Sequence, residues 1–255
     1  MDKLSAVIIT YNEERNIGKC LDSVKNIADE IVVVDSYSSD KTQEICELYG
    51  VRFFQRGWDN YSAQKNYANG LASFDYVLSL DADEILSKEL STSIEKAKEH
   101  FDFDAYKFNR LTFFCGSPIR HCGWYPDRKI RLWNKNHAEW KGSVHENLTF
   151  DKDPKLKYLF GDLLHYTSSS IYSRVEKVNN YSDSKADDAF VRGKSVSLFK
   201  IMLKPLFKFF GVYIIKRGFL DGFSGFLVSM FAALDSFLFL SKLRLMKMIN
   251  NKNSK

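Results

Sequence analysis

YVLSLDADE, residues 76–84, joins an apolar run directly to acidic side chains. Tyr76–Leu80 has the pattern of a short buried strand, and Asp81 and Asp83 follow at its end. In an extended chain, a spacing of two residues puts both carboxylates on the same side. Carboxylates are rarely buried unless they are paired or bind a metal, and oxygen ligands at a strand end suit Mg²⁺ or Mn²⁺. The alternative interpretation is a solvated turn after the strand.

The residues around this stretch alternate between β-rich runs and helical periodicity. Each run is short, and polar side chains follow the predicted strands at Thr10, Asp35 and Asp81. Asn12 is a plausible N-cap for the first helix. This alternation predicts an α/β fold with a mostly parallel sheet flanked by helices, whose ligands bind at the carboxyl ends of the strands. The predicted strands are 4–10, 30–34, 51–55 and 76–80, and the predicted helices are 13–27, 39–50, 60–71 and 87–100.

Composition and missing motifs exclude several classes. The chain has 255 residues, of which 45% are hydrophobic, and this is enough for one large domain plus an appendage. Its net charge is +5. The sequence has no G-x-G-x-x-G after the first strand and no G-x-x-x-x-G-K-[ST], so dinucleotide binding and P-loop chemistry are disfavoured. The four cysteines lack zinc-site spacing. The first residues do not read as a signal peptide, so we expect a cytoplasmic catalytic part.

Several motifs together resemble the family 2 inverting glycosyltransferases of the GT-A fold, over residues 4–245. They also resemble the bacterial subgroup that adds glucose or a related sugar to the lipopolysaccharide core. Two other functions remain open, a nucleotidyltransferase and a non-catalytic membrane-bound binding module. The segment TYNEERN is acidic and lacks glycine, which counts against a nucleotidyltransferase. The motifs are VIITYNEERNIGKCLDSV (7–24), EIVVVDSYSSDKT (30–42), QKNYA (64–68), LSLDADE (78–84), RHCGWYPDRKIRLW (120–133), VHENL (144–148) and LLHYT (163–167).

The resemblance implies a UDP-sugar donor, UDP-glucose first, bound with Mg²⁺ or Mn²⁺. Asp83 would be the main metal ligand, with Asp81 beside the ribose and the metal shell and His165 joining that shell. His165 can also be read as a core histidine, and Lys65 as a solvated helix charge. The residues expected to contact the nucleotide are Thr10, Tyr11, Glu13, Asp35, Lys65 and Asp81.

Inversion needs a general base that deprotonates the acceptor hydroxyl. By resemblance the base is Glu146, although His145-Glu146 stands where the family usually has a Glu-Asp pair. This departure leaves Asp127 as a competing base, with a turn cap as its alternative role. Arg128 and Arg131 are candidate partners of the diphosphate or of an acceptor phosphate.

The C-terminal part differs in composition from the rest. We expect a catalytic domain over residues 1–194 and an amphipathic helical tail over 195–255. In 199–217, Lys and Arg alternate with Phe, Leu and Ile, as in a helix lying in a membrane interface. The run 223–240 is near the lower limit for a membrane span but contains Asp235. We therefore predict a lipid-linked saccharide acceptor, an anionic membrane surface as partner, no nucleic acid, and a peripheral location on the inner face of the cell membrane. The alternative is ordinary helix packing.

Overall fold

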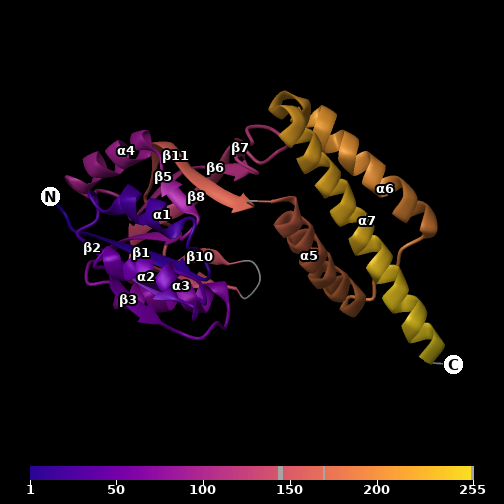
Figure 1. Ribbon diagram of the computed structural model, residues 1–255, viewed down its shortest axis with the longest axis horizontal. Helices are drawn as coiled ribbons and strands as arrows, with labels where there is room; N and C mark the ends of the chain where they lie inside the picture. Colours follow the sequence, from indigo (N-terminus) through magenta and orange to yellow (C-terminus); the bar gives the residue numbers. More distant parts are fainter. Residues whose placement is uncertain (143–145, 169, 254–255) are drawn as a thin grey trace. The chain divides into compact units, whose positions relative to one another are not determined.

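The computed structural model describes residues 1–142, 146–168 and 170–253, and the chain packs as two units (Figure 1). One unit comprises Met1–Leu111 and Asp127–Tyr166, and the other Thr112–Pro126 and Thr167–Lys255. The expected division between a catalytic domain, 1–194, and a tail, 195–255, concerns function and stays a prediction.

The parallel half of the sheet lies in the first unit. β-branched and other apolar residues form four parallel strands in the order β3-β2-β1-β4, close to the predicted ranges. The register pairs Thr10 with Asp35 and Ile9 with Asp81, so three strand ends meet at one edge of the sheet. The strands are β1 (Leu4–Thr10), β2 (Glu30–Asp35), β3 (Arg52–Gln55) and β4 (Tyr76–Asp81).

Beyond β4 the sheet continues in the order β8-β6-β11-β5, with antiparallel pairs β4–β8, β8–β6 and β11–β5. The predicted α/β architecture is confirmed, and this antiparallel extension completes a mixed sheet. A two-stranded ribbon of β9 and β10 accompanies it. These strands are β5 (Glu84–Leu86), β6 (Ala105–Phe114), β7 (Ser117–Pro118), β8 (Asp127–Asn134), β9 (Ala138–Lys141), β10 (Asn147–Phe150) and β11 (Leu156–Ser168).

Helices cover both faces of the parallel strands because β1 is apolar on both sides. Ile8 packs into a core with α1, α2 and α4, whereas Val7 packs into a second core with α3. The first helix is shorter than predicted, and the cap prediction was wrong: Asn16 is its N-cap. Asn12 instead adopts φ 53° and accepts a hydrogen bond from the Ser39 amide. The helices are α1 (Ile17–Val24), α2 (Thr42–Leu48), α3 (Tyr61–Leu71) and α4 (Lys88–Lys98).

The second unit is helical, and α7 lies between α5 and α6 (Figure 1). Asp235 of α7 forms an ion pair with Lys185 of α5 at 2.8 Å. In the described part of the chain, the stretch Gly218–Asn250 is long and apolar enough to cross a membrane by length and composition. The elements are α5 (Ile171–Val191), α6 (Leu198–Phe210), a π-helical turn (Gly211–Ile215), a 3-10 turn (Gly218–Asp221) and α7 (Gly222–Asn253).

Candidate active site

The carboxylate of Asp81, at the end of β4, lies between two buried cations. Lys65 Nζ is 3.0 Å from its Oδ1, and Arg131 Nη2 donates to its Oδ2 at 2.9 Å. Burial by itself would raise the pKa of Asp81, but Lys65 and Arg131 outweigh it and hold that pKa well below its usual range. The Lys65 side chain is fully buried, so the interpretation of Lys65 as a solvated helix charge was wrong.

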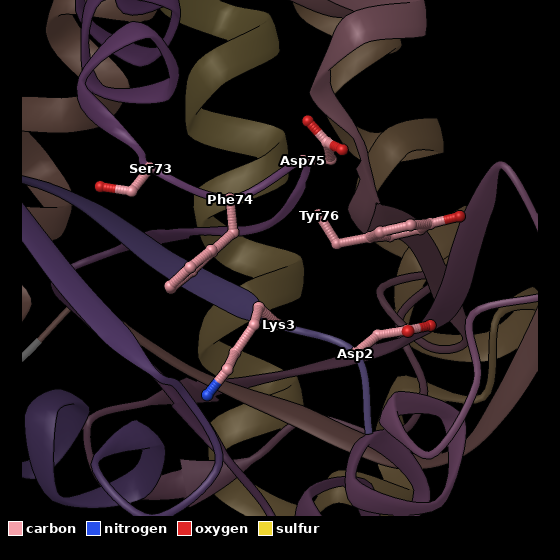
Figure 2. A pocket seen from close by; sticks show the side chains of 6 residues that line it. All are labelled: Asp2, Lys3, Ser73, Phe74, Asp75 and Tyr76. Atoms are coloured by element: carbon pink, nitrogen blue, oxygen red, sulfur yellow. The ribbon is translucent and has the colours of Figure 1, made fainter.

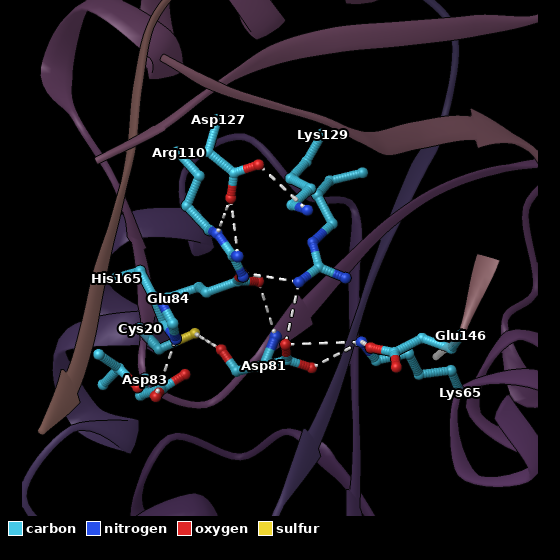
Figure 3. Close-up of polar contacts among 12 residues, drawn as sticks. Cys20, Lys65, Asp81, Asp83, Glu84, Arg110, Asp127, Lys129, Glu146 and His165 are labelled. Atoms are coloured by element: carbon cyan, nitrogen blue, oxygen red, sulfur yellow. Dashed lines mark hydrogen bonds and ion pairs between the residues drawn. The ribbon is translucent and has the colours of Figure 1, made fainter. Parts of the chain in front are cut away.

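Asp81 belongs to a chain of alternating charges that runs through the site (Figure 3). Arg131 also donates to Glu84 Oε1 at 2.7 Å, and Arg110 Nη1 is 3.4 Å from the same oxygen. Arg110 then donates to Asp127 Oδ2 at 2.8 Å and 3.0 Å. Because each charge faces opposite charges, the buried groups compensate one another. In order the chain is Asp127, Arg110, Glu84, Arg131, Asp81, Lys65 and Glu146.

Asp83 takes no part in that chain and faces His165 instead. His165 Nε2 is 3.3 Å from Asp83 Oδ2, and both side chains are partly exposed. The contact follows from strand pairing: His165 lies opposite Glu84 in the β5–β11 ladder, and the Tyr166 amide donates to the Asp83 carbonyl at 2.9 Å. Residues 82 and 83 form a turn, so Asp81 and Asp83 do not share one side of an extended strand as predicted.

The donor chemistry of Asp83 and His165 fits a divalent cation. A carboxylate oxygen and an imidazole nitrogen are both metal ligands, and Mg²⁺ is often held by one or two carboxylates plus substrate phosphates. Within the described residues, no group of three or more His, Cys, Asp or Glu side chains is arranged to hold a metal. The pair thus offers two protein ligands, and Asp81 as a third stays a prediction because its oxygens face cations.

Cys20 lies beneath the site without joining it. Its thiol is fully buried and lies 3.9 Å from the Asp81 carbonyl oxygen. Burial first, and then the nearby Glu84 and Asp83, raise the pKa of Cys20 well above its ordinary value. The thiolate is the form that binds metals and attacks electrophiles, so this residue is a neutral core side chain.

The two candidate bases differ in how many cations hold them. Asp127 accepts two bonds from Arg110 on Oδ2, and its Oδ1 is 3.1 Å from Lys129 Nζ. Glu146 Oε1 is 3.4 Å from Lys65 Nζ, and the side chain is about a quarter exposed. The ammonium of Lys65 therefore bridges Glu146 to Asp81. His145, the other half of the expected dipeptide, lies outside the described residues.

The residues expected at the nucleotide occupy the first two strand ends. Asp35 is fully buried and accepts hydrogen bonds from the Ser38 amide at 2.8 Å and the Ser38 hydroxyl at 2.5 Å. Its carboxylate therefore shapes the turn after β2. Tyr11 is exposed, whereas Thr10 is buried. The Glu13 amide donates to the hydroxyl of Thr42 at 2.8 Å. Contacts of these residues with a nucleotide stay a prediction.

Two residues of the charge chain, Glu84 and Arg110, were not predicted from the sequence. Glu84 is fully buried and follows Asp83 directly. The sequence signal that could have identified it is an acidic residue within an apolar strand, because a buried acid needs a partner. Arg110 lies opposite Asp127 in the β6–β8 ladder, and only that register reveals their pairing.

A pocket on the first unit lies away from these residues (Figure 2). It is lined by Asp2 and Lys3, just before β1, and by Ser73–Tyr76 at the start of β4. It therefore lies at the amino-terminal edge of the parallel strands, whereas the charge chain lies at the carboxyl edge, where α/β sheets bind ligands.

Comparison with known proteins places this chain in a family. The model of glycosyl transferase family 2 matches residues 5–155, more than half of the chain. A glycosyltransferase of Rickettsia typhi is 36% identical over 262 residues, covering 96% of this chain and 87% of the relative. The lipopolysaccharide core biosynthesis glycosyltransferase LpsC of Rhizobium meliloti is 30% identical over 253 residues, covering 94% of this chain and 91% of the relative.

Part of the chain also resembles solved structures. Glucosyl-3-phosphoglycerate synthase of Mycobacterium tuberculosis, in complex with Mn²⁺, UDP and glucosyl-3-phosphoglycerate, matches with 19% identity and a TM-score of 0.37, covering 44% of each chain. The family match and the long alignments to the relatives confirm the resemblance inferred from the motifs. The chain therefore belongs to glycosyl transferase family 2 and is a transferase enzyme.

Proposed function

We propose that this chain is a metal-dependent inverting glycosyltransferase. It transfers a hexose, most simply glucose, from a UDP-sugar to a lipid-linked saccharide in the assembly of lipopolysaccharide or another surface glycan. The observation that supports it best is the meeting of two groups at one strand end: the Asp83–His165 pair and the Lys65-bridged carboxylates of Asp81 and Glu146. The relative LpsC, named for lipopolysaccharide core biosynthesis, supports the acceptor class.

The base in this proposal is Glu146. It would accept the proton of the acceptor hydroxyl while that oxygen attacks the anomeric carbon and the bond to the UDP leaving group breaks. Glu146 is preferred over Asp127 because Arg110 and Lys129 occupy both Asp127 oxygens, whereas Glu146 has Lys65 at one oxygen. Lys65 and Arg131 would keep Asp81 ionised and fixed beside the reacting groups.

Asp83 and His165 would hold the divalent cation, which supplies charge neutralisation for the departing diphosphate. His165 Nε2 and Asp83 Oδ2 lie 3.3 Å apart, which is close enough for one cation to contact both. Thr10, Tyr11, Glu13 and Asp35 would line the nucleoside side of the donor pocket, because their strand ends adjoin that of β4. The acceptor would be reached at the inner face of the cell membrane.

The direct test is a screen of nucleotide sugars with purified protein, with Mn²⁺ or Mg²⁺ present or chelated. We expect UDP release from one UDP-hexose, dependent on the cation, and an inverted glycosidic product by mass spectrometry and NMR. Activity with a nucleoside triphosphate and release of pyrophosphate would instead favour a nucleotidyltransferase. If no donor is consumed under any condition, the result would favour a non-catalytic binding module.

A further inference from the structure

The helix α6 leaves an apolar stripe uncovered. Phe199, Met202, Leu206 and Phe210 recur three or four residues apart and therefore lie on one face of the helix. Their exposed fractions are 71%, 64%, 56% and 52%. Single exposed apolar residues are ordinary, but a contiguous set on one helix face marks an interaction surface.

The opposite side of α6 is anchored within the second unit. Ile201 is buried, and Val212 in the following π-helical turn belongs to a core that also contains Val228 and Phe231 of α7. The orientation of α6 is thus set by packing, and the apolar stripe faces away from that core.

The start of α7 extends the same surface. The Phe226 ring lies 5.8 Å from the Phe209 ring and 6.0 Å from the Tyr213 ring, measured between centroids. Met230 lies one turn further along α7, and its side chain is 47% exposed. We define the docking face as these side chains together: Phe199, Met202, Leu206, Phe210, Phe226 and Met230.

The charge along α6 and the residues that follow it to 220 has one sign. Residues 198–220 contain five Lys or Arg and no Asp or Glu. Lys200 follows Phe199 at the border of the stripe, whereas Lys204 approaches the Phe239 ring of α7 and Lys208 lies two turns after the buried Ile201. Long basic side chains beside an apolar stripe are typical of a helix that lies in the interface of an anionic membrane.

This charge pattern discriminates between occupants. In a second copy of this chain, the same face would bring basic residues against basic residues, with no acid in 198–220 to compensate them. An anionic bilayer supplies both an apolar phase for the stripe and negative charge for the lysines.

The packing of α7 argues against a membrane span. Besides the Asp235–Lys185 ion pair, Lys242 Nζ donates to the Asn179 side-chain oxygen at 2.8 Å and is 2.6 Å from Asp183 Oδ1. Threading α7 through the bilayer would break these contacts with α5 or carry the polar α5 into hydrocarbon.

We propose that the docking face of α6 and α7 lies flat on an anionic lipid bilayer, with Lys200 at the level of the headgroups. Membrane binding by this face deepens the proposed function. It rests on that function only for what the binding achieves, which is access to a lipid-linked acceptor. The binding itself requires no sugar chemistry, so the two proposals can fail separately.

The test is cosedimentation of the full chain with vesicles of phosphatidylcholine alone or mixed with phosphatidylglycerol, at low and high salt. We expect binding to the anionic vesicles only, weakened by salt. K200Q should lower the partition coefficient about 5-fold. F199S/L206S should lower it by more than about 10-fold, because about two apolar side chains lose their burial in the interface.

The matched control is Y172S/V191S, which replaces two exposed apolar residues of α5 outside the docking face. It should sediment like the parent chain, and circular dichroism should show that all variants are folded. Metal-dependent donor hydrolysis in solution should be unchanged in every variant. If the parent chain shows no such hydrolysis, the proposed function is overturned, whereas the docking face is not. Binding by F199S/L206S equal to the parent would overturn the proposal. So would a lipid-free dimer that this variant abolishes, because the face would then join two copies.

Discussion

Arg131 and Glu84 form the centre of the buried charge chain, with Arg131 Nη2 donating to Glu84 Oε1 at 2.7 Å. The side chain of Glu84 is fully buried and that of Arg131 is nearly so. Burial opposes the charge of Arg131, but Glu84 and Asp81 raise its pKa above the ordinary value, so the guanidinium stays charged. The pair connects Asp81 to Arg110 and Asp127, and its integrity fixes the position of Asp81.

Arg131→Leu is therefore expected to destabilise the first unit strongly. The substitution leaves Glu84 and Asp81 without their shared cation, and an uncompensated buried charge costs about 3–5 kcal/mol. Urea unfolding, followed by the fluorescence of Trp133 and Trp140, measures the change. The control is Arg192→Leu. Arg192 and its partner Asp188 are both exposed, and their ion pair contributes at most about 1 kcal/mol. Equal effects of the two substitutions would mean that the charge chain is not buried as described.

Glu146→Gln is expected to lower turnover about 10²–10⁴-fold, because the amide keeps the shape of the side chain but cannot accept the acceptor proton. Donor affinity should remain close to that of the parent, since Glu146 faces the acceptor in the proposed mechanism. Steady-state kinetics and donor titration by calorimetry separate the two quantities. Asp127→Asn is the comparison: if this variant loses turnover to that extent and Glu146→Gln does not, the base is Asp127.

Asp83→Asn is expected to weaken cation binding and, with it, cation-dependent binding of the UDP-sugar. The substitution removes the anionic member of the Asp83–His165 pair, while Asp81 remains held by Lys65 and Arg131. Mn²⁺ titration followed by electron paramagnetic resonance reports the loss without any turnover. Affinity for Mn²⁺ like that of the parent would show that the cation is held elsewhere.

The strand ends were predictable from the sequence, whereas the partners of the acids were not. Periodicity and polar side chains after apolar runs depend only on neighbouring residues, and they located Thr10, Asp35 and Asp81 at one edge. The ion pair of Asp81 with Arg131 joins residues 50 positions apart, and it depends on the pairing of β8 with β4. The prediction that Asp81 and Asp83 lie on the same side of one strand was wrong, because the chain turns directly after Asp81.

The burial of Lys65 shows the same limit. Its place on α3 was predicted, but its ammonium is enclosed by Asp81, Glu146 and the ring of Trp140, whose centroid lies 4.9 Å away. These partners come from three separate later segments. Local sequence therefore identifies which residues are polar and where strands end, and tertiary packing determines which of them remain available to a ligand.

Acid is expected to destabilise the chain through Asp29 and Glu30 at the start of β2. Burial by itself would raise both pKa values, but hydrogen bonds from Lys3 and Lys98 to Asp29, and from Ser5 and Ser73 to Glu30, lower each to about 2. The folded-state pKa values lie below the ordinary values of 3.8 and 4.5. Their stabilisation is therefore complete above about pH 5 and is lost as the pH falls toward about 2.

D29N/E30Q tests this prediction. At pH 7 it should lower the free energy of unfolding by on the order of 1 kcal/mol per site, after allowance for solvent screening. Its stability should then fall less steeply than that of the parent between about pH 5 and pH 2. Thermal unfolding across this pH range measures both effects, with Asp188→Asn as the exposed control. Parallel pH curves for the parent and D29N/E30Q would contradict the assignment.

Gly161→Ala is expected to destabilise the contact between β11 and the start of α4. Gly161 has φ +109°, where a side chain is strained by about 1–3 kcal/mol. A Cβ atom there would also lie 2.3 Å from the Leu90 backbone nitrogen, the group that donates to the Ser87 cap of α4. Gly70→Ala is the matched control, because a Cβ at Gly70 meets nothing within 4 Å and alanine is preferred to glycine in a helix by at most about 1 kcal/mol at this position in the last turn of α3. Differential scanning calorimetry should therefore show a lower Tm for Gly161→Ala and an equal or higher Tm for Gly70→Ala. A Tm for Gly161→Ala equal to that of the parent would mean that β11 does not pack closely against the first turn of α4.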